Sequence, residues 1–176
     1  TYSDCSLRVT DCNGNISDNL SISPFNVYFP QSLYSVTYGN GHFVAVGNGG
    51  RILTSPTGDN NSWTIQESET TSHLYDVGTD NHSFVAVGAS GKLISSVDNG
   101  TTWTTPSTWG QSSLSGTTVT LSAVAGQVDN ISGDKDFVVV TNYPNGIVGY
   151  SSDNGSTWST GSDTTQIEIA YGDDLY

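Results

Sequence analysis

Two aspartates, Asp98 and Asp153, stand in the same repeated context and are the first candidates for chemistry. Each belongs to an eight-residue pattern, S-x-D-x-G-x-T-W, at positions 96–103 and 151–158. A carboxylate can act as a general acid or base, bind a cation, or accept backbone N–H groups in a tight turn. The last role fits this context best, because Gly adopts positive φ at low cost and Trp buries a large apolar surface.

A third, looser copy of this pattern occupies positions 55–63 and also ends in Trp. We interpret all three copies as structural turns, in which the Trp fixes the turn to its sheet. The residues assigned to this role are Ser96, Asp98, Gly100, Trp103, Ser151, Asp153, Gly155, Trp158 and Trp63.

The remaining carboxylates show no pattern typical of catalysis. A glycosidase needs two facing carboxylates, and nothing in the context of Glu67, Glu69 and Glu168 selects a pair. The sequence also contains no G-x-S-x-G motif and no glycine-rich phosphate-binding loop. We therefore predict that the protein is not an enzyme, and we expect no catalytic residues.

Candidate metal ligands are few and poorly spaced. His42, His73 and His82 show neither the H-x-x-x-H nor the H-x-H spacing of zinc sites, so we predict surface polar residues. Positions 11–18 place oxygen side chains as at the start of a Ca²⁺ loop, but the Gly and Glu that complete such a loop are missing and Cys12 lies inside it. A solvated turn is the better interpretation, and we expect no cofactor.

The two cysteines, Cys5 and Cys12, are separated by six residues. Because no C-x-x-C motif or nearby His pair supports a metal site, a disulfide closing a small N-terminal loop is favoured, and it indicates an oxidising compartment. The sequence begins at Thr1, lacks Met and has no apolar run long enough to span a membrane. We expect a mature extracellular or cell-surface chain, or a fragment of one.

The composition favours strands and turns over helices. Only 34% of the 176 residues are apolar; Val, Ile, Tyr, Phe and Trp are prominent among them, and Ser, Thr, Asn, Asp and Gly fill most of the rest. The net charge is −13, with four basic residues against 17 acidic ones. This charge opposes both nucleic-acid binding and docking on an anionic membrane.

Seven N-x-S/T sequons lie in predicted turns or loops, where a glycan can be accommodated. The high Ser and Thr content accounts for part of this number. In an organism that N-glycosylates its proteins, the acceptors would be Asn15, Asn19, Asn60, Asn81, Asn99, Asn130 and Asn154.

The chain repeats with a period of about 40 residues, the size typical of a β-propeller blade. Phe43 and Phe84 are 41 residues apart, and Trp63 and Trp103 are 40 apart. Each unit has four short apolar segments between Gly-rich turns, which predicts an all-β fold of propeller-like blades with four antiparallel strands. Three full units are expected at 33–67, 74–107 and 121–160, and an incomplete fourth at 167–176.

Residues 1–31 lie outside the repeat and form a predicted N-terminal arm, followed by the repeat domain at 32–176. Within the arm we expect a short strand at 4–10 and a turn at 12–18. A strand-like segment at 21–29 contains Pro24, which restricts it to an edge position or a free arm.

The two clean turns resemble the Asp-box, or bacterial neuraminidase repeat, and the F-V-A-V-G strands resemble blades of photosystem assembly factor-like propellers. The resemblance covers about residues 33–176 and implies a sialidase-like propeller in which Asp98 and Asp153 are structural. A sialidase binds its substrate carboxylate with three arginines, whereas this chain has only Arg8 and Arg51. The resemblance therefore implies a non-enzymatic member of this group.

Three and a fraction units do not make an obvious closed ring. The chain is a piece of a longer protein, or the arm completes the last unit, or the arm pairs with a neighbouring copy. The third alternative predicts a structural protein that assembles head-to-tail into a filament or surface array. Its assembly strand would carry Ile22, Phe25, Val27 and Phe29.

Two other functions remain open. The chain is alternatively an extracellular glycan- or protein-binding module, in which Trp109, Tyr143 and Tyr150 either stack on sugars or pack between blades. An assembly factor that scaffolds another protein is the last alternative, although the sequence shows no basic docking patch.

Overall fold

Strands rich in β-branched and aromatic residues fill most of the part of the chain that the computed structural model describes. The described residues are 9–10, 16–17, 32–109, 119–127, 136–142, 146 and 148–161. The chain divides into two units, Thr1–Pro30 and Gln31–Tyr176. The predicted assembly strand, both cysteines and the incomplete fourth unit lie outside the described residues.

In the first unit, β1 (Val9–Thr10) pairs antiparallel with β2 (Ile16–Ser17). The sequence predicts a turn over 12–18, but Ile16 and Ser17 form a strand opposite Thr10 and Val9. The prediction gave weight to the polar residues of this stretch, whereas Ile has a high β-propensity and suits a paired strand.

The second unit contains three antiparallel sheets, each with its strands in sequence order. The first sheet consists of β3 (Leu33–Gly39), β4 (His42–Gly47), β5 (Ile52–Ser55) and β6 (Thr64–Gln66). The second sheet consists of β7 (Leu74–Thr79), β8 (Phe84–Gly88) and β9 (Leu93–Ser96). The third sheet consists of β10 (Leu121–Gly126), β11 (Phe137–Thr141), β12 (Val148–Ser151) and β13 (Ser159–Gly161).

The all-β prediction is confirmed for the described residues. Two short 3₁₀ turns, η1 (Asn48–Gly50) and η2 (Ala89–Gly91), occupy equivalent places in the first and second sheets, and Trp109 is also in 3₁₀ conformation. Four strands per sheet are present in the first and third sheets, while the second has three.

The fourth strand expected in the second sheet is reduced to a single bridge between Ser95 and Thr104. In the first sheet the corresponding ladder continues to the pair Ile52–Gln66. Pro106 stands at the position equivalent to Gln66, 40 residues later. Because Pro has no backbone N–H to donate, the ladder ends before it.

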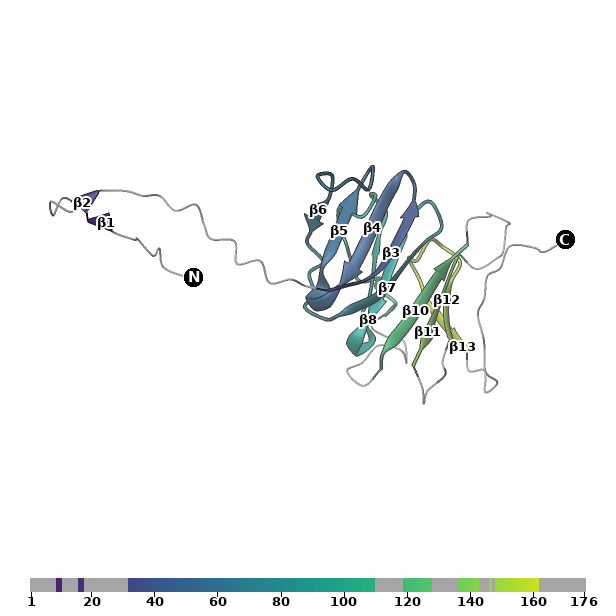
Figure 1. The fold of residues 1–176 in the computed structure, drawn as a ribbon. Helices are drawn as coiled ribbons and strands as arrows, with labels where there is room; N and C mark the ends of the chain where they lie inside the picture. Colours follow the sequence, from purple (N-terminus) through teal and green to yellow (C-terminus); the bar gives the residue numbers. More distant parts are fainter. Residues whose placement is uncertain are drawn as a thin grey trace. The chain divides into compact units, whose positions relative to one another are not determined.

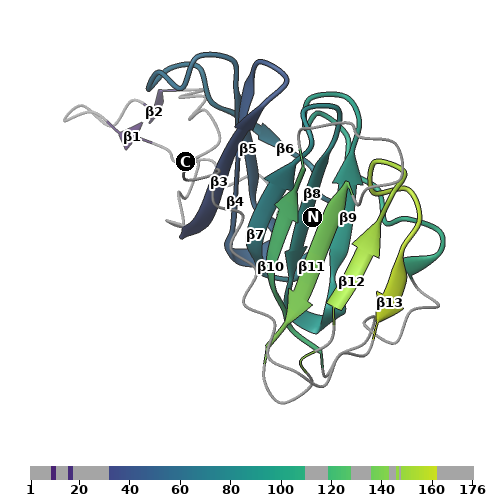
Figure 2. The same cartoon turned by 90° about the vertical axis from the view of Figure 1, so that its right-hand side faces the viewer.

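The first strands of the three sheets lie side by side. Strand β7 contacts both β3 and β10, and Figures 1 and 2 show the three as neighbouring strands of successive sheets. The Asp76 carboxylate joins them, because it accepts a hydrogen bond from Ser35 Oγ at 2.7 Å and one from the Val124 N–H at 2.8 Å. One carboxylate thus links all three sheets.

Two apolar clusters fill the spaces between successive sheets. The cluster between the first and second sheets contains Val44, Val46, Ile52, Leu74, Val77, Phe84, Ala86, Ile94 and Trp103. The cluster between the second and third sheets contains Val85, Val87, Leu93, Trp109, Val119, Leu121, Val124, Phe137, Val139 and Trp158. The second sheet is therefore covered on both faces.

Candidate functional site

The turn at 96–103 is closed by the side chains that the pattern selects. Ser96 Oγ accepts a hydrogen bond from the Gly100 N–H at 3.0 Å and donates one to Asp98 Oδ1 at 2.8 Å. The carboxylate also accepts hydrogen bonds from the backbone N–H and the hydroxyl of Thr102, at 2.9 and 2.7 Å. Trp103 Nε1 donates to the Gly100 carbonyl oxygen at 2.8 Å. Asp98 therefore organises the turn.

The turn at 151–158 repeats this arrangement. Gly155 N–H donates to Ser151 Oγ at 3.0 Å, and that hydroxyl donates to Asp153 Oδ1 at 2.9 Å. Thr157 donates to the same carboxylate from its N–H and its hydroxyl, at 2.8 and 2.6 Å. Trp158 Nε1 donates to the Gly155 carbonyl oxygen at 2.9 Å. The two turns therefore have the same hydrogen-bonding arrangement.

The looser copy at 55–63 keeps part of this arrangement. Ser55 Oγ accepts hydrogen bonds from the N–H groups of Thr57 and Gly58, at 3.2 and 2.7 Å. Trp63 Nε1 donates to the Gly58 carbonyl oxygen at 3.2 Å. The Ser and the Trp therefore keep their roles although this turn is one residue longer.

These hydrogen bonds set the acidity of both aspartates. Burial raises the pKa of Asp98, but the hydrogen bonds from Thr102 and Ser96 outweigh it and hold the pKa below its ordinary value of 3.8. For Asp153 burial likewise raises the pKa, but the hydrogen bonds from Thr157 and Ser151 outweigh it and hold the pKa below 3.8. Both carboxylates are poor general acids at neutral pH, because they stay ionised there.

Each clean turn also packs against the preceding sheet. A Cβ at Gly100 (φ +79°) would lie 2.9 Å from Thr54 Cγ2 and 3.2 Å from Val44 Cγ2 of the first sheet. A Cβ at Gly155 (φ +78°) would lie 2.9 Å from Val85 Cγ2 of the second sheet. The turns therefore hold one sheet against the next.

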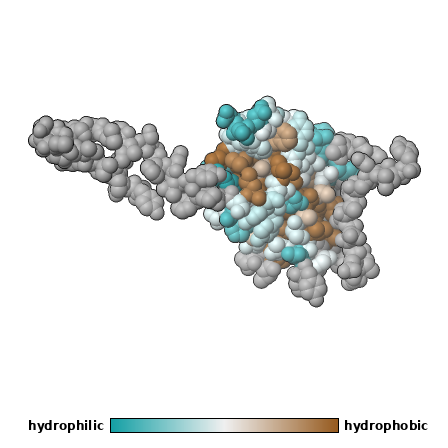
Figure 3. All heavy atoms as spheres, viewed as in Figure 1, coloured by the Kyte–Doolittle hydropathy of each residue, from teal (hydrophilic) through white to brown (hydrophobic). Residues whose placement is uncertain are grey.

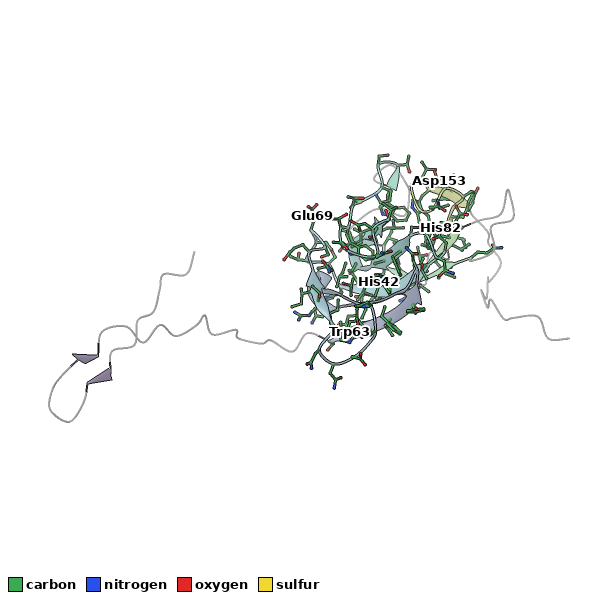
Figure 4. All side chains as sticks on the ribbon, turned by 90° about the horizontal axis from the view of Figure 1, so that it is seen from above. His42, Trp63, Glu69, His82 and Asp153 are labelled. Atoms are coloured by element: carbon green, nitrogen blue, oxygen red, sulfur yellow. The ribbon has the colours of Figure 1, made fainter. Side chains whose placement is uncertain are left out.

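Among the described residues, the other candidate catalytic side chains do not all lie together. Glu67, Glu69 and Arg51 line one cavity of about 610 Å³, and Glu69 has a left-handed φ of +55°. Figure 4 shows Glu69 well away from His82 and Asp153. Among the described residues, His, Cys, Asp and Glu form no group of three or more able to hold a metal ion.

The described histidines serve ordinary structural contacts or lie near the surface. His73 Nδ1 accepts a hydrogen bond from the Gly49 N–H at 3.0 Å, and His82 is exposed. His82 lies two residues after the buried Asp80. Asp80 Oδ1 accepts hydrogen bonds from the N–H groups of His82 and Ser83, at 2.8 and 2.6 Å. Asp80 therefore closes another turn.

Four predicted glycan acceptors fall in the described part of the chain: Asn60, Asn81, Asn99 and Asn154. Asn81, Asn99 and Asn154 have left-handed φ values, which fits their predicted turns. Asn15, Asn19 and Asn130 lie outside the described residues. No helix among the described residues is long and apolar enough to cross a membrane.

The two described aromatic residues that were considered for sugar stacking do not form a surface cluster. Trp109 is 2% exposed, donates from Nε1 to the Gly91 carbonyl oxygen at 2.8 Å, and packs edge-on against Trp158. Trp109 therefore fills the core between sheets. Tyr150 is partly exposed, and Tyr143 lies outside the described residues.

The strongest candidate surface is instead one side of the first sheet, which the sequence analysis missed. Val36, Ala45, Leu53 and Ile65 stand opposite one another across its four strands. Val36 and Ile65 are each 59% exposed. With Tyr38, Phe43 and Trp63, these residues form what we call the first-sheet face, and Figure 3 shows apolar residues gathered over β3, β4 and β5.

A groove of about 410 Å³ lies on this face, lined by Leu33, Tyr34, Ser35, Val36, Ala45 and Trp63. Tyr34 contacts Tyr75 of the second sheet, with ring centroids 5.8 Å apart. One residue that lines the groove therefore also contacts the second sheet.

A signal for this face was present in the sequence. The run Phe43-Val44-Ala45-Val46 is apolar at consecutive positions, a pattern typical of a strand covered on both sides. Val44 and Val46 are buried against the second sheet, but the other side of β4 has no sheet against it among the described residues.

Comparison of the chain with protein-family models and with curated proteins found no match.

Proposed function

We propose that this chain is a non-enzymatic extracellular structural protein that assembles head-to-tail with copies of itself, and that its three sheets are β-propeller-like blades. The blade interpretation is supported by the sequential strand order, by the adjacent first strands β3, β7 and β10, and by the repeated turns that fasten successive sheets. The turns resemble Asp-boxes in sequence, which supports the same interpretation.

The observation that carries the assembly proposal is a difference between equivalent valines. Val36, Val77 and Val124 occupy the same register position in the three sheets. Val77 and Val124 are 4% and 8% exposed because the preceding sheet covers them, whereas Val36 is 59% exposed. The first sheet therefore carries a face of the kind that the repeat elsewhere buries.

The exposed apolar side chains of the first-sheet face favour association. Burying a Val or Ile side chain contributes about 1.5–3 kcal/mol relative to leaving it in water. The first-sheet face offers Val36, Ile65 and Tyr38, each more than half exposed. A contiguous apolar patch on a strongly charged protein is typical of an interaction surface.

The N-terminal arm is the second part of this proposal. Its predicted assembly strand, with Ile22, Phe25, Val27 and Phe29, lies outside the described residues, and strand exchange through it remains a prediction. The extracellular location likewise rests on the predicted Cys5–Cys12 disulfide and on the sequons.

Sedimentation of the purified chain over a wide concentration range tests the proposal, with electron microscopy of the largest species. We expect oligomers that lengthen with concentration and appear as filaments or arrays. A species that stays monomeric at the highest concentration, with no higher-order particles in micrographs, would contradict it. A chain lacking residues 1–31 measures how much of the association depends on the arm.

The groove beside Trp63 favours one alternative, an extracellular glycan-binding module. Tyr34 and Trp63 line its walls, and aromatic surface of this kind suits stacking on a sugar. A glycan array probed with the monomeric protein would find a ligand under this alternative, and Trp63→Ala would abolish the signal. Absence of any signal removes this candidate.

A further inference from the structure

The outer side of the third sheet is the second surface that the repeat leaves without a neighbouring sheet in the described part of the chain. Val140 stands opposite Val148, and Val138 opposite Tyr150, on β11 and β12. All four are partly exposed. Ala123 and Ala125 of β10 continue the same two rows. We call these six residues the third-sheet face.

The repeat register shows what this face is equivalent to. Val140 and Val148 correspond to Val46 and Ile52 of the first sheet, and to the pair Val87–Leu93 of the second. Those equivalents are all 0% exposed, because the next sheet covers them. In the third sheet no described sheet follows.

The two internal interfaces show how the two kinds of face fit. Between the first and second sheets, Val44, Val46 and Ile52 pack against Val77, Phe84, Ala86 and Ile94. Between the second and third sheets, Val85, Val87 and Leu93 pack against Val124, Phe137 and Val139. The same pair of faces thus forms both interfaces within one chain. A third interface of this kind could form between two copies.

We propose that the first-sheet face of one copy packs on the third-sheet face of a second copy and so reproduces the internal interface between molecules. This inference rests on the proposed function, and it names the surfaces that function would use. The partner is a second copy of this chain because the internal interfaces identify its third-sheet face as the matching surface. A contact between unlike faces joins each copy to two others.

Two departures from the repeat fall on this contact. By equivalence with Gly100 and Gly155, the turn at 55–63 would seat on the third-sheet face, and this turn is one residue longer than its two counterparts. Tyr150 stands where Thr54 and Ser95 stand in the other two sheets. A longer turn thus meets a larger side chain in the contact between copies.

Two charged substitutions test the inference, each blocking one face. Val36→Lys places a charge on the first-sheet face, and Val140→Lys places one on the third-sheet face, while Val36→Thr and Val140→Thr are matched uncharged controls of nearly the same shape. Because an unpaired buried charge is strongly unfavourable, each Lys variant alone should associate about a hundredfold more weakly than the wild type. The Thr controls should lose much less of their affinity for other copies.

Mixing the two Lys variants is the decisive measurement. Each still has one intact face of the opposite kind, so an equimolar mixture should form a dimer that does not grow further, measured by sedimentation or native mass spectrometry. Dimers formed by either variant alone, or no heterodimer in the mixture, would overturn the inference. Ile65→Lys and Val148→Lys repeat the test, and far-UV circular dichroism with thermal unfolding verifies that every variant is folded.

The outcome also separates this inference from the proposed function. If the wild type assembles and all Lys variants assemble equally well, the protein is self-assembling but uses other surfaces, such as the N-terminal arm, and the inference is wrong. If the wild type stays monomeric at all concentrations, the proposed function and the inference both fail. The wild type would also stay monomeric if another segment of the same chain covered one of the two faces.

Discussion

Single side chains in this protein mainly close turns, including those whose chemistry first suggested catalysis. Asp98 and Asp153 accept three hydrogen bonds each from neighbouring Ser and Thr residues, and these bonds lower their pKa. Gly100 and Gly155 provide the left-handed backbone and leave room for the preceding sheet. The residues of these two turns therefore hold neighbouring sheets together.

Alanine substitutions at two glycines separate backbone strain from packing. Gly100→Ala forces a side chain into φ +79° and places Cβ 2.9 Å from Thr54 Cγ2, so we expect a loss of about 2–4 kcal/mol in the free energy of unfolding. Gly41→Ala has a similar φ of +76° but meets nothing within 4 Å, so only about 1 kcal/mol should be lost. Urea unfolding measures both, and equal losses would show that packing at Gly100 contributes nothing.

The lowered pKa values of Asp98 and Asp153 predict sensitivity to acid. Since the folded-state pKa lies below the ordinary value of 3.8, the unfolded state binds protons more readily at low pH. The stabilisation is fully present above the ordinary pKa and is lost as the pH falls through the folded-state pKa. Thermal unfolding across this pH range should show a shallower decline for Asp98→Asn and Asp153→Asn than for the wild type.

Among the elements, the first strands of the sheets share a polar link. Asp76 on β7 accepts hydrogen bonds from Ser35 on β3 and from the N–H of Val124 on β10. A single carboxylate therefore sets the positions of three strands that are far apart in sequence. Apolar packing between sheets surrounds this link on both sides.

Substitutions at Asp76 measure how strongly the three strands are coupled. Asp76→Ala leaves Ser35 and the Val124 N–H without their partner, so we expect a loss of about 1–3 kcal/mol in the free energy of unfolding. Asp76→Asn should lose less, because its amide can donate to the Ser35 hydroxyl and accept from the Val124 N–H. Chemical denaturation checks the order, and an Asn variant as unstable as the Ala variant would contradict it.

Much of the element order could be predicted from the sequence, because Gly-rich turns and the F-V-A-V-G segments set the strands locally. The shortened end of the second sheet was missed, since the repeat predicts a strand after Trp103 and only Pro106 interrupts its ladder. The strand Ile16–Ser17 was missed because polar neighbours dominate that stretch.

The turn residues could also be predicted from spacing, whereas the exposure of the first-sheet face could not. Val36, Val77 and Val124 look equivalent in the repeat, and their burial depends on whether another sheet lies beside them. That is a property of the assembled sheets and not of any one unit. Trp109 illustrates the same point, because neighbouring sheets bury it and remove it as a surface residue.

For the whole molecule, net charge and apolar surface act in opposite directions. A net charge of −13 makes copies repel one another, while the first-sheet face favours contact. Association should therefore depend on the salt that screens the charge.

Raising the ionic strength should strengthen self-association. At about 1 M salt the screening length falls to about 3 Å, so repulsion between copies nearly vanishes while apolar contacts persist. We expect the concentration for half-assembly to fall as NaCl is raised, measured by light scattering on the wild type. Dissociation at high salt would instead indicate that ion pairs hold the copies together.

In the described part of the chain, the two faces that lack a neighbouring sheet are unlike, and this gives any stack of copies a direction. One end always presents the first-sheet face and the other always presents the third-sheet face, so a stack anchored at one end exposes a single kind of tip. A molecule that carried only one of the two faces would stop growth at one end and leave the other end free. Polarity of the assembly would thus follow from the order of three repeats within one chain.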